Sequence, residues 1–514
     1  MHRTTNIFPM TPDRALPAFL LGATAFLSLL LFTPLCASVF LPGDVTVYLL
    51  NAARMLQGQT IYRDFFQFTP PGTELVYLTI FRLFGLRAWV PNAMLLLLGL
   101  SMTWLSIAIS RKVMRGWAVF LPGLLFLTCS HYNGLDATHH WYSILVVMTA
   151  LLIVIEKRTL ARVATVGALC GLAAFFTLGR GLAAVVGFGV FLAWEHRRKS
   201  QTWLTLLKVE ACLAAAFLLT VVASDAYFVW KVGLARILDC TVIFGLRYYP
   251  TYASANTVKV YLFSPPPLRP WYGLPFLLIY VFVHILIPLV YLLFFVRYRR
   301  QARVHPDHPW EALMALNITG LFLFIGTAPA PSFFRLCVVS LPALILFVWF
   351  LGQPGSIERV LANLAWAFAI LMVVLEPIKV QRHARCYIDL PSGRTAFLRP
   401  IVYERYKWIS EHTRPSEPFF EGVWADTYVA LSLHNPTPVP YVTNTDYTRP
   451  EQVQAVVKSL ERTGVRLVLW SLELDTPQGK IEGDHLGPLR VFLRSRYHMV
   501  KTFADGDQVW ERKE

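Results

Sequence analysis

The sequence predicts a polytopic α-helical membrane protein that ends in a polar C-terminal α/β domain. Of its 514 residues, 55% are hydrophobic and only 15% are charged, whereas soluble globular chains carry nearer a quarter charged residues. The mean hydropathy is +0.50, and the charge deficit is concentrated in long apolar runs that can each cross about 30 Å of hydrocarbon. We therefore divide the chain into a membrane domain, residues 1–376, and a C-terminal domain, residues 377–514.

Eleven apolar segments are predicted to be transmembrane helices. The first is too long for a signal peptide and has no clean small-residue cleavage pattern before Gly43, so we expect a retained anchor. Residues 74–84 are also apolar, but they are too short to span and are expected to form a helix at the membrane interface. The predicted spans are residues 15–41, 90–110, 116–130, 142–155, 163–178, 181–194, 203–223, 272–296, 310–327, 336–352 and 361–375.

Basic clusters follow the second, fourth, sixth and eighth predicted spans, as in Arg197-Arg198-Lys199. The positive-inside rule makes these connectors cytoplasmic. The N-terminus is then cytoplasmic, the C-terminal domain is extracytoplasmic, and the protein is integral to an inner or plasma membrane. The net charge of +16 reflects this topology and anionic membrane lipids. Nucleic acid is not an expected partner, because the clusters are short and divided among loops.

The C-terminal domain is predicted to be a layer of helices on strands. It contains no nucleophile elbow, phosphate loop or metal-ligand spacing, so a lid or an acceptor-binding module is favoured over a second enzyme. Of the seven cysteines, Cys240 and Cys386 lie on the outer side, where they could pair. No Cys/His spacing indicates a zinc or iron–sulfur site. The predicted helices are residues 403–411, 425–433, 450–463 and 486–497, and the strands are 418–422, 465–470, 499–504 and 508–512.

The first outer loop, residues 42–89, is the most informative part of the sequence. Asp44 lies just beyond the first span and precedes apolar residues at helical spacing, which predict an amphipathic helix with one face on the membrane, ending at Gly58. A carboxylate held at a membrane face is costly, which favours a functional role for Asp44. The alternative is that Asp44 caps this helix, and the two roles are compatible.

Further polar residues follow on the same predicted side. Asp64 lies in Tyr62-Arg63-Asp64, ahead of a rigid Pro70-Pro71-Gly72 turn, and a simple ion pair with Arg63 is its structural alternative. The second outer connector contains Asp136, His139 and His140. These residues either belong to an interfacial aromatic belt or bind phosphate and support an acid.

Two arginines lie in short outer connectors, which normally lack basic residues. Arg180 lies between two glycines, and Arg335 follows Phe333-Phe334. Both could extend toward the membrane interface. The functional interpretation is that their paired N–H donors bind a lipid-linked phosphate.

The order and sidedness of these features resemble the GT-C superfamily of polytopic glycosyltransferases. The shared pattern is an early loop Asp, an amphipathic helix ending in Gly, Tyr-x-Asp, Pro-Pro-Gly, and a later outward Arg335 followed by Leu341-Pro342. It is similar to protein O-mannosyltransferases, the lipid A aminoarabinose transferase and galacturonosyltransferases of the RgtA/B/C/D type. The resemblance is clearest over residues 40–200.

The resemblance implies an inverting glycosyltransferase that uses a polyprenyl-phosphate sugar as donor and an envelope glycan, lipid or protein as acceptor. Asp44 matches the position of the family's catalytic carboxylate, which would act as general base. The mannosyltransferases have an Asp-Glu pair there, but this chain has Asp44-Val45, so Asp64 or Asp136 is left to supply a second carboxylate. Arg180, Arg335, His139 and His140 are assigned to substrate binding by location. No cofactor is firmly implied, and a divalent cation stays an open option.

Two other functions are compatible with many membrane spans. A flippase or transporter would show repeated halves and charges at the membrane midplane, and no internal repeat is found in the sequence. A non-catalytic assembly partner with the same fold is the other alternative, against which the intact Asp44 argues, although fold alone does not establish activity.

Overall fold

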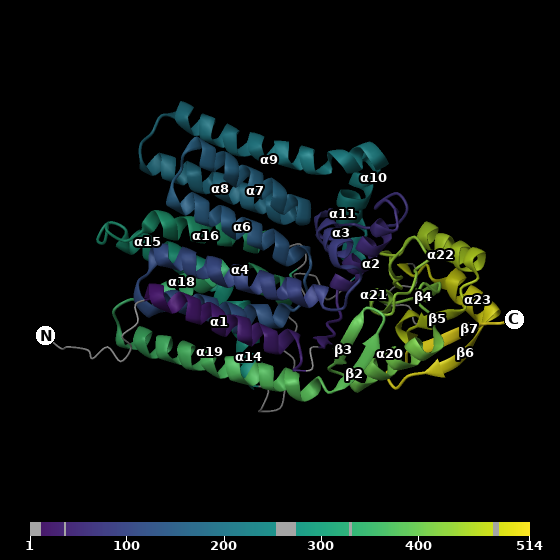
Figure 1. The fold of residues 1–514 in the computed structure, drawn as a ribbon. Coiled ribbons are helices and arrows are strands. Elements are labelled where there is room, and N and C mark those ends of the chain that lie inside the picture. The colour runs from purple at the N-terminus through teal and green to yellow at the C-terminus, as the bar shows by residue number, and fades with distance from the viewer. Residues whose placement is uncertain (1–11, 35–36, 253–273, 328–330, 476–482) are drawn as a thin grey trace.

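The computed structural model describes residues 12–34, 37–252, 274–327, 331–475 and 483–514. Long helices run side by side in a bundle, and the C-terminal domain lies at one end of it (Figure 1). The first described helix, α1, begins at the end of the bundle opposite the C-terminal domain. The predicted fold class, a polytopic helical protein with a C-terminal α/β domain, is confirmed.

Among the described residues, seven helices are long and apolar enough to cross a membrane, and an eighth span is counted if the α17–α18 pair, bent by 64°, is one span. The seven helices correspond to seven of the predicted spans, and the bent pair corresponds to the tenth predicted span, residues 336–352. The first helix ends at Leu31, ten residues earlier than predicted because the chain then enters a short strand. The long helices are α1 (Pro12–Leu31), α4 (Val90–Val113), α6 (His139–Glu156), α8 (Leu178–Arg198), α9 (Trp203–Val232), α14–η7–α15 (Leu274–Val281, Phe282–Leu286, Ile287–Gln301) and α19 (Ser356–His383), with α17 (Phe333–Val339) and α18 (Leu341–Leu351) as the bent pair.

The remaining three predicted spans are helical but shorter or irregular. Two are single apolar helices, and the third, residues 116–130, combines 3-10, α and π turns. The start of the predicted eighth span, residues 272–273, lies outside the described residues. These elements are α7 (Leu160–Phe176), α16 (Trp310–Ile325), η1 (Gly116–Phe120), α5 (Leu121–Leu125), η2 (Phe126–His131) and η3 (Tyr132–Gly134).

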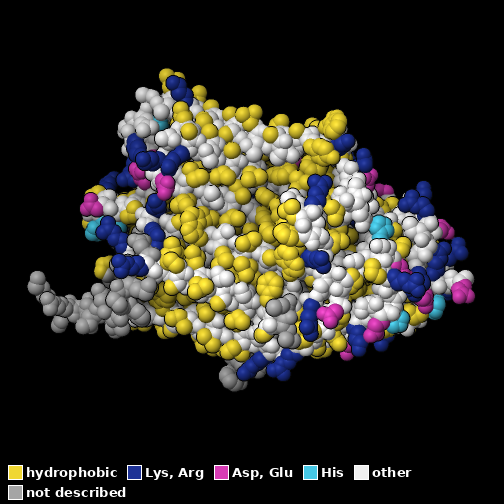
Figure 2. All heavy atoms as spheres, viewed as in Figure 1, with side chains coloured by type: hydrophobic (Ala, Val, Ile, Leu, Met, Phe, Trp, Pro, Cys, Tyr) yellow, Lys and Arg dark blue, Asp and Glu magenta, His cyan; other side chains and the backbone are white. Residues whose placement is uncertain are grey.

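The outer surface of the bundle is apolar. Hydrophobic side chains cover its middle, and Lys and Arg side chains gather toward its two ends (Figure 2). On α9, Leu219 and Trp230 are 70% and 75% exposed, and only three of the helix's residues are buried. A face of this kind is stable only if something apolar covers it, as lipid chains do.

The first loop folds into two helices, and protein covers the first of them, whereas the second is partly exposed. α2 (Val45–Leu56) ends next to Gly58, whose φ is +89°, and α3 (Gly72–Phe84) follows the Pro70-Pro71 turn. The prediction that α2 rests one face on the membrane is wrong, because every residue from 48 to 54 is buried. Even Arg54 is enclosed, and it donates to the Thr437 carbonyl at 2.8 Å.

The C-terminal domain contains the predicted α/β layer. A four-stranded sheet has the order β4-β5-β7-β6, with β4 and β5 parallel and the other neighbours antiparallel. The predicted elements are all found, the second of the helices being much shorter than expected. They are α20 (Pro400–His412), β4 (Phe419–Glu421), α21 (Thr427–Ala430), α22 (Pro450–Thr463), β5 (Leu467–Trp470), α23 (Gly487–Arg496), β6 (Tyr497–Thr502) and β7 (Gln508–Arg512). A short 3-10 helix that was not predicted, η8 (Leu472–Leu474), follows β5.

The two domains are joined by a second, small sheet that the sequence did not predict. α19 continues to His383, so the predicted boundary at residue 376 falls inside a helix. β2 (Cys386–Leu390) and β3 (Gly393–Phe397) then form a hairpin, and β1 (Ser38–Val39) pairs in parallel with β3. The segment just before the first loop is therefore hydrogen-bonded to the C-terminal domain.

A further group of short helices follows α9 on the side of the bundle nearest the C-terminal domain (Figure 1). Cys240 lies among them and is buried, while Cys386 begins β2, and both are free thiols. The short helices are α10 (Leu234–Leu238), η4 (Asp239–Ile243), α11 (Phe244–Arg247) and α12 (Tyr249–Tyr252).

Candidate active site

A cavity of about 190 Å³ lies where the first loop, the start of α6, the start of α17 and the C-terminal domain meet. Four residues singled out in the sequence line it: Asp44, His139, His140 and Arg335. They come from three separate stretches of the membrane domain. The fold therefore brings an acid, two imidazoles and a guanidinium to one enclosed volume.

The start of α2 is capped by Asp136 from the second outer connector. The Val45 N–H donates to the Asp136 carboxylate at 2.9 Å, and the Asp44 N–H also bonds to it. Gly43 permits this approach, because its φ is +150° and a Cβ there would lie 3.2 Å from the Asp136 carboxyl carbon. Asp44 occupies the N-cap position, but its side chain makes no capping bond. The capping role considered for Asp44 thus belongs to Asp136.

Asp44 lines the cavity, and its side chain is exposed to the solvent there. Protein atoms nevertheless surround the carboxylate and remove part of its hydration. This desolvation raises the pKa of Asp44, and the Arg335 guanidinium opposes the rise. Burial, and then the neighbouring Asp44 charge, raise the pKa of Asp136 well above its usual value. Two carboxyl groups this close disfavour a double negative charge. The proton is held by Asp136 more readily than by Asp44, which has a cation beside it.

His139 and His140 are the first two residues of α6, and their rings lie against each other with centroids 3.9 Å apart. The Tyr48 hydroxyl, from α2, is hydrogen-bonded to Nδ1 of His139. His140 packs against the Phe334 ring at 5.1 Å. Both histidines are nearly enclosed, at 7% and 4% exposed, so contacts from both sides hold their rings at the cavity wall.

Arg335 is fixed in place on α17. Ser332 caps this helix by accepting a bond from the Arg335 N–H at 3.3 Å. The guanidinium donates to the Tyr249 hydroxyl and lies over the Tyr249 ring, 5.6 Å from its centroid. Stacking of this kind orients a planar guanidinium without neutralising its charge, and Arg335 stays positive at the cavity.

Arg180 lies behind the histidines and does not line the cavity. It is 3% exposed and donates to the His140 carbonyl at 3.0 Å and to Ser143 Oγ at 3.1 Å. Its side chain thus braces the first turn of α6. The structure places Arg180 behind the cavity wall, where it supports α6, and not among the residues that could contact a phosphate in the cavity. Its charge still acts on His139 and His140.

Asp64 lies outside the cavity. Its carboxylate forms an ion pair with Arg63 at 2.9 Å and accepts from the Thr60 N–H at 2.7 Å. These are the contacts of an exposed loop carboxylate, the structural alternative given for it. Asp64 is therefore removed from the site, because its charge is satisfied locally and its side chain does not reach the cavity.

A different carboxylate from the C-terminal domain lies near Asp44. Asp426 accepts from the Thr46 hydroxyl at 2.8 Å. Burial raises the pKa of Asp426 to about 6, and the Asp44 charge contributes to this. The neighbouring Glu421 has a pKa raised to about 8, first by burial and then by Asp426. No local pattern predicted this acid pair, because its contact with α2 joins residues 380 positions apart.

Aromatic residues of the C-terminal domain form the far wall of the cavity, and the sequence analysis missed them. Trp424, Tyr441 and Tyr447 line it. The two tyrosine rings stack 5.9 Å apart and their hydroxyls are 2.9 Å apart. Aromatic residues are common in the core of any domain, so only the tertiary structure shows that these three line the cavity.

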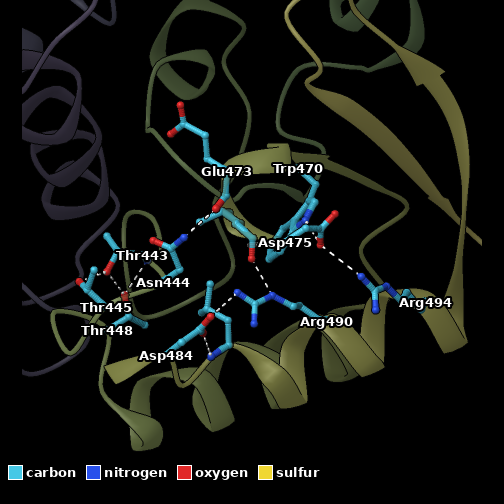
Figure 3. Close-up of polar contacts among 12 residues, drawn as sticks. Thr443, Asn444, Thr445, Thr448, Trp470, Glu473, Asp475, Asp484, Arg490 and Arg494 are labelled. Atoms are coloured by element: carbon cyan, nitrogen blue, oxygen red, sulfur yellow. Dashed lines mark hydrogen bonds and ion pairs between the residues drawn. The ribbon is translucent and has the colours of Figure 1, made fainter. Parts of the chain in front are cut away.

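The loop that carries these tyrosines is held by polar contacts within the domain (Figure 3). Hydroxyls of Thr443, Thr445 and Thr448 bond to one another at 3.1 and 3.2 Å. Asn444 Nδ2 donates to the Glu473 carbonyl at 2.6 Å. The loop is thus tied to the segment after β5, which helps to hold the aromatic wall in position.

This arrangement suits proton removal beside a developing anion. Asp44 can accept a proton once ionised, and the positive Arg335 is available to an anionic group in the same cavity. In the described residues, no three His, Cys, Asp or Glu side chains are placed to hold a metal ion. The cavity's own residues provide a carboxylate and a cation.

Comparison with known proteins identifies the fold. No protein-family model matches the chain, and no curated protein matches it. Among solved structures, ArnT from Cupriavidus metallidurans bound to undecaprenyl phosphate is similar over 96% of both chains, with a TM-score of 0.59 and 13% identity. The chain has the GT-C fold.

The apo structure of the same ArnT gives a like result, with a TM-score of 0.58 and 15% identity over 96% of this chain and 97% of that one. The match covers the bundle and the C-terminal domain together, so both halves belong to the shared GT-C fold. The resemblance seen in the early loop sequence is confirmed at the level of fold.

Proposed function

We propose that this chain is a membrane glycosyltransferase that moves a sugar from a polyprenyl-phosphate donor to an acceptor hydroxyl in the cavity at Asp44. One observation carries the proposal: Asp44 and Arg335, far apart in sequence, line the same cavity and their charges interact. Support also comes from the GT-C fold and from ArnT, whose structure holds undecaprenyl phosphate.

In the proposed reaction the ionised Asp44 takes the proton from the acceptor hydroxyl. The acceptor oxygen forms a bond to the anomeric carbon as the bond from that carbon to the phosphate oxygen breaks. The leaving polyprenyl phosphate takes the electron pair, and Arg335 stabilises its charge. Attack opposite the leaving group inverts the anomeric centre.

The surrounding residues support this reaction. Asp136 caps α2 and so fixes the position of Asp44. Arg180 braces the turn that bears His140. Membrane lipid and the polyprenyl donor are the expected partners, with an envelope glycan, lipid or protein as acceptor. The basic residues in the connectors after the second, fourth, sixth and eighth predicted spans support a cytoplasmic N-terminus and an extracytoplasmic C-terminal domain.

The experiment is transfer by the purified protein. The protein is incubated with a set of polyprenyl-phosphate sugars and envelope extracts, and release of polyprenyl phosphate is followed by mass spectrometry. The proposal predicts release only when an acceptor is present, and its loss in the Asp44→Asn variant. Equal release from wild type and Asp44→Asn would contradict the assignment of the cavity as the reaction site.

A further inference from the structure

A second cavity, of about 740 Å³, lies at the end of the bundle opposite the C-terminal domain. It is formed by the ends of α4, α6 and α8, the start of α7, and the loop that leads into α16. Figure 2 shows Lys and Arg side chains interspersed with acidic ones at this end of the molecule. Because helix ends flank it, the cavity is at the depth of lipid headgroups if the bundle spans a membrane.

The cavity wall is strongly cationic. Five Lys or Arg residues line it against two glutamates, Glu156 and Glu311. Each glutamate is already paired with two cations: Glu156 with Lys112 at 2.9 Å and Arg162 at 3.2 Å, and Glu311 with Arg158 and with Lys199, which lies outside the lining. An entering anion therefore meets a surplus of positive charge. The basic lining residues are Lys112, Lys157, Arg158, Arg162 and Arg198.

Ion pairs hold the wall in a fixed shape. Arg158 bridges two helices, with contacts of 3.2 Å to Glu195 of α8 and 3.2 Å to Glu311 of α16. Lys199 joins the same two carboxylates, at 2.6 and 3.3 Å. Such a network orders the side chains before a ligand arrives, which reduces the entropy lost on binding.

Two of the five cations are outside this network. Lys157 and Arg198 have no carboxylate partner among the described residues, and Arg198 instead lies over the Trp194 ring at 5.6 Å. Both are exposed. Near them the exposed Leu160, at 53%, begins α7 and continues the surface toward the apolar face of the bundle. A phosphate bound by these cations would thus have its acyl chains beside an apolar surface.

We propose that this cavity binds the phosphate headgroup of an anionic phospholipid from the membrane leaflet at this end of the bundle. Basic pockets between membrane helices are suited to such headgroups. A soluble phosphate has no apolar part to contact the adjoining apolar surface, whereas the acyl chains of a phospholipid can contact it. This surface therefore favours a lipid as the ligand. The site is separate from the cavity at Asp44, because the two lie at opposite ends of the bundle.

The test titrates phosphatidylglycerol into the purified full-length protein in detergent and counts bound lipid by native mass spectrometry. The double variant Lys157→Gln/Arg198→Gln is compared with wild type. At about a factor of five per basic residue, the variant should bind about thirtyfold more weakly. Neither side chain belongs to the ion-pair network, so the fold should be kept, as thermal melting will show.

The matched control is Arg299→Gln/Arg300→Gln, which removes two exposed cations from the last turn of α15, outside the cavity. It should bind within about twofold of wild type, since isolated surface charges contribute little. Equal weakening in both double variants would show general surface attraction and overturn the site. No weakening in Lys157→Gln/Arg198→Gln would overturn it as well.

Two arms on the wild-type protein distinguish the source of the phosphate. Binding of phosphatidylglycerol should weaken as salt rises, and neither phosphatidylcholine nor soluble glycerol phosphate should displace it at equal concentration. Displacement by glycerol phosphate would mean a site for a soluble phosphate. Displacement by phosphatidylcholine would mean a groove for acyl chains alone, and either outcome would overturn the proposal.

Discussion

Arg335 is expected to act on the reaction in two separable ways, through the leaving phosphate and through Asp44. Replacing it by Gln removes a charge-assisted hydrogen bond worth about 1.5–3 kcal/mol, which corresponds to about a 10- to 150-fold loss in transfer rate. It also removes the cation that lowers the pKa of Asp44. Burial then acts on Asp44 unopposed, so a higher pH is needed to ionise it.

The assay is the pH dependence of transfer by purified variants. Transfer by a general base increases as pH rises through its pKa, so the acid limb of the profile should move to higher pH in Arg335→Gln. Arg335→Lys keeps the charge and should leave the limb near its wild-type position, while recovering only part of the rate because the planar fork is lost.

The control is Arg299→Gln, at the far end of α15 from the cavity. It should leave both the rate and the limb unchanged. If Arg335→Gln matched Arg299→Gln in rate and in the position of the acid limb, Arg335 would have no part in phosphate stabilisation or in setting the Asp44 pKa.

Three further predictions follow from the same contacts. Asp136→Ala should lower the free energy of unfolding by about 1 kcal/mol through loss of the α2 cap, whereas Asp136→Asn should keep most of it; equal melting temperatures for the two variants would contradict this. Arg180→Ala should lower both thermal stability and transfer rate by removing the support of His140, with Arg180→Lys recovering part; wild-type melting and transfer in Arg180→Ala would remove that role. A reporter active only in the cytoplasm should stay silent when fused after Glu514, and its activity would reverse the proposed topology.

Local patterns were sufficient for the elements that depend on local physics. Runs of apolar residues located the seven described helices that are long enough to span, and the bent α17–α18 pair, because crossing hydrocarbon requires a continuous stretch. The α22 bounds, Pro450–Thr463, were predicted correctly from its Pro start and amphipathic spacing. The short β1 strand was missed, since its pairing with β3 joins residues more than 350 positions apart. The β2–β3 hairpin was missed although its pairing is local.

The candidate site was recovered only in part for the same reason. Asp44 stood out because a carboxylate is costly to hold at a membrane face, and Arg335 because short outer connectors normally lack basic residues. The capping of α2 by Asp136 depends on two loops meeting across 91 residues, which no single-sequence pattern records. Asp64 resembled a site residue, yet it is paired with its neighbour Arg63. Asp426 and the aromatic wall belong to a domain whose sequence shows no catalytic motif.

The measurement that tests the central claim most directly is the transfer rate of purified Asp44→Asn, with Asp64→Asn as the matched control. Because Asp136 makes the cap, Asn at position 44 leaves the start of α2 intact. General-base catalysis contributes roughly a hundred- to ten-thousand-fold, so Asp44→Asn should lose at least about a hundredfold at unchanged melting temperature, while Asp64→Asn stays near wild type. Transfer by Asp44→Asn within a few-fold of wild type would show that Asp44 is not the base.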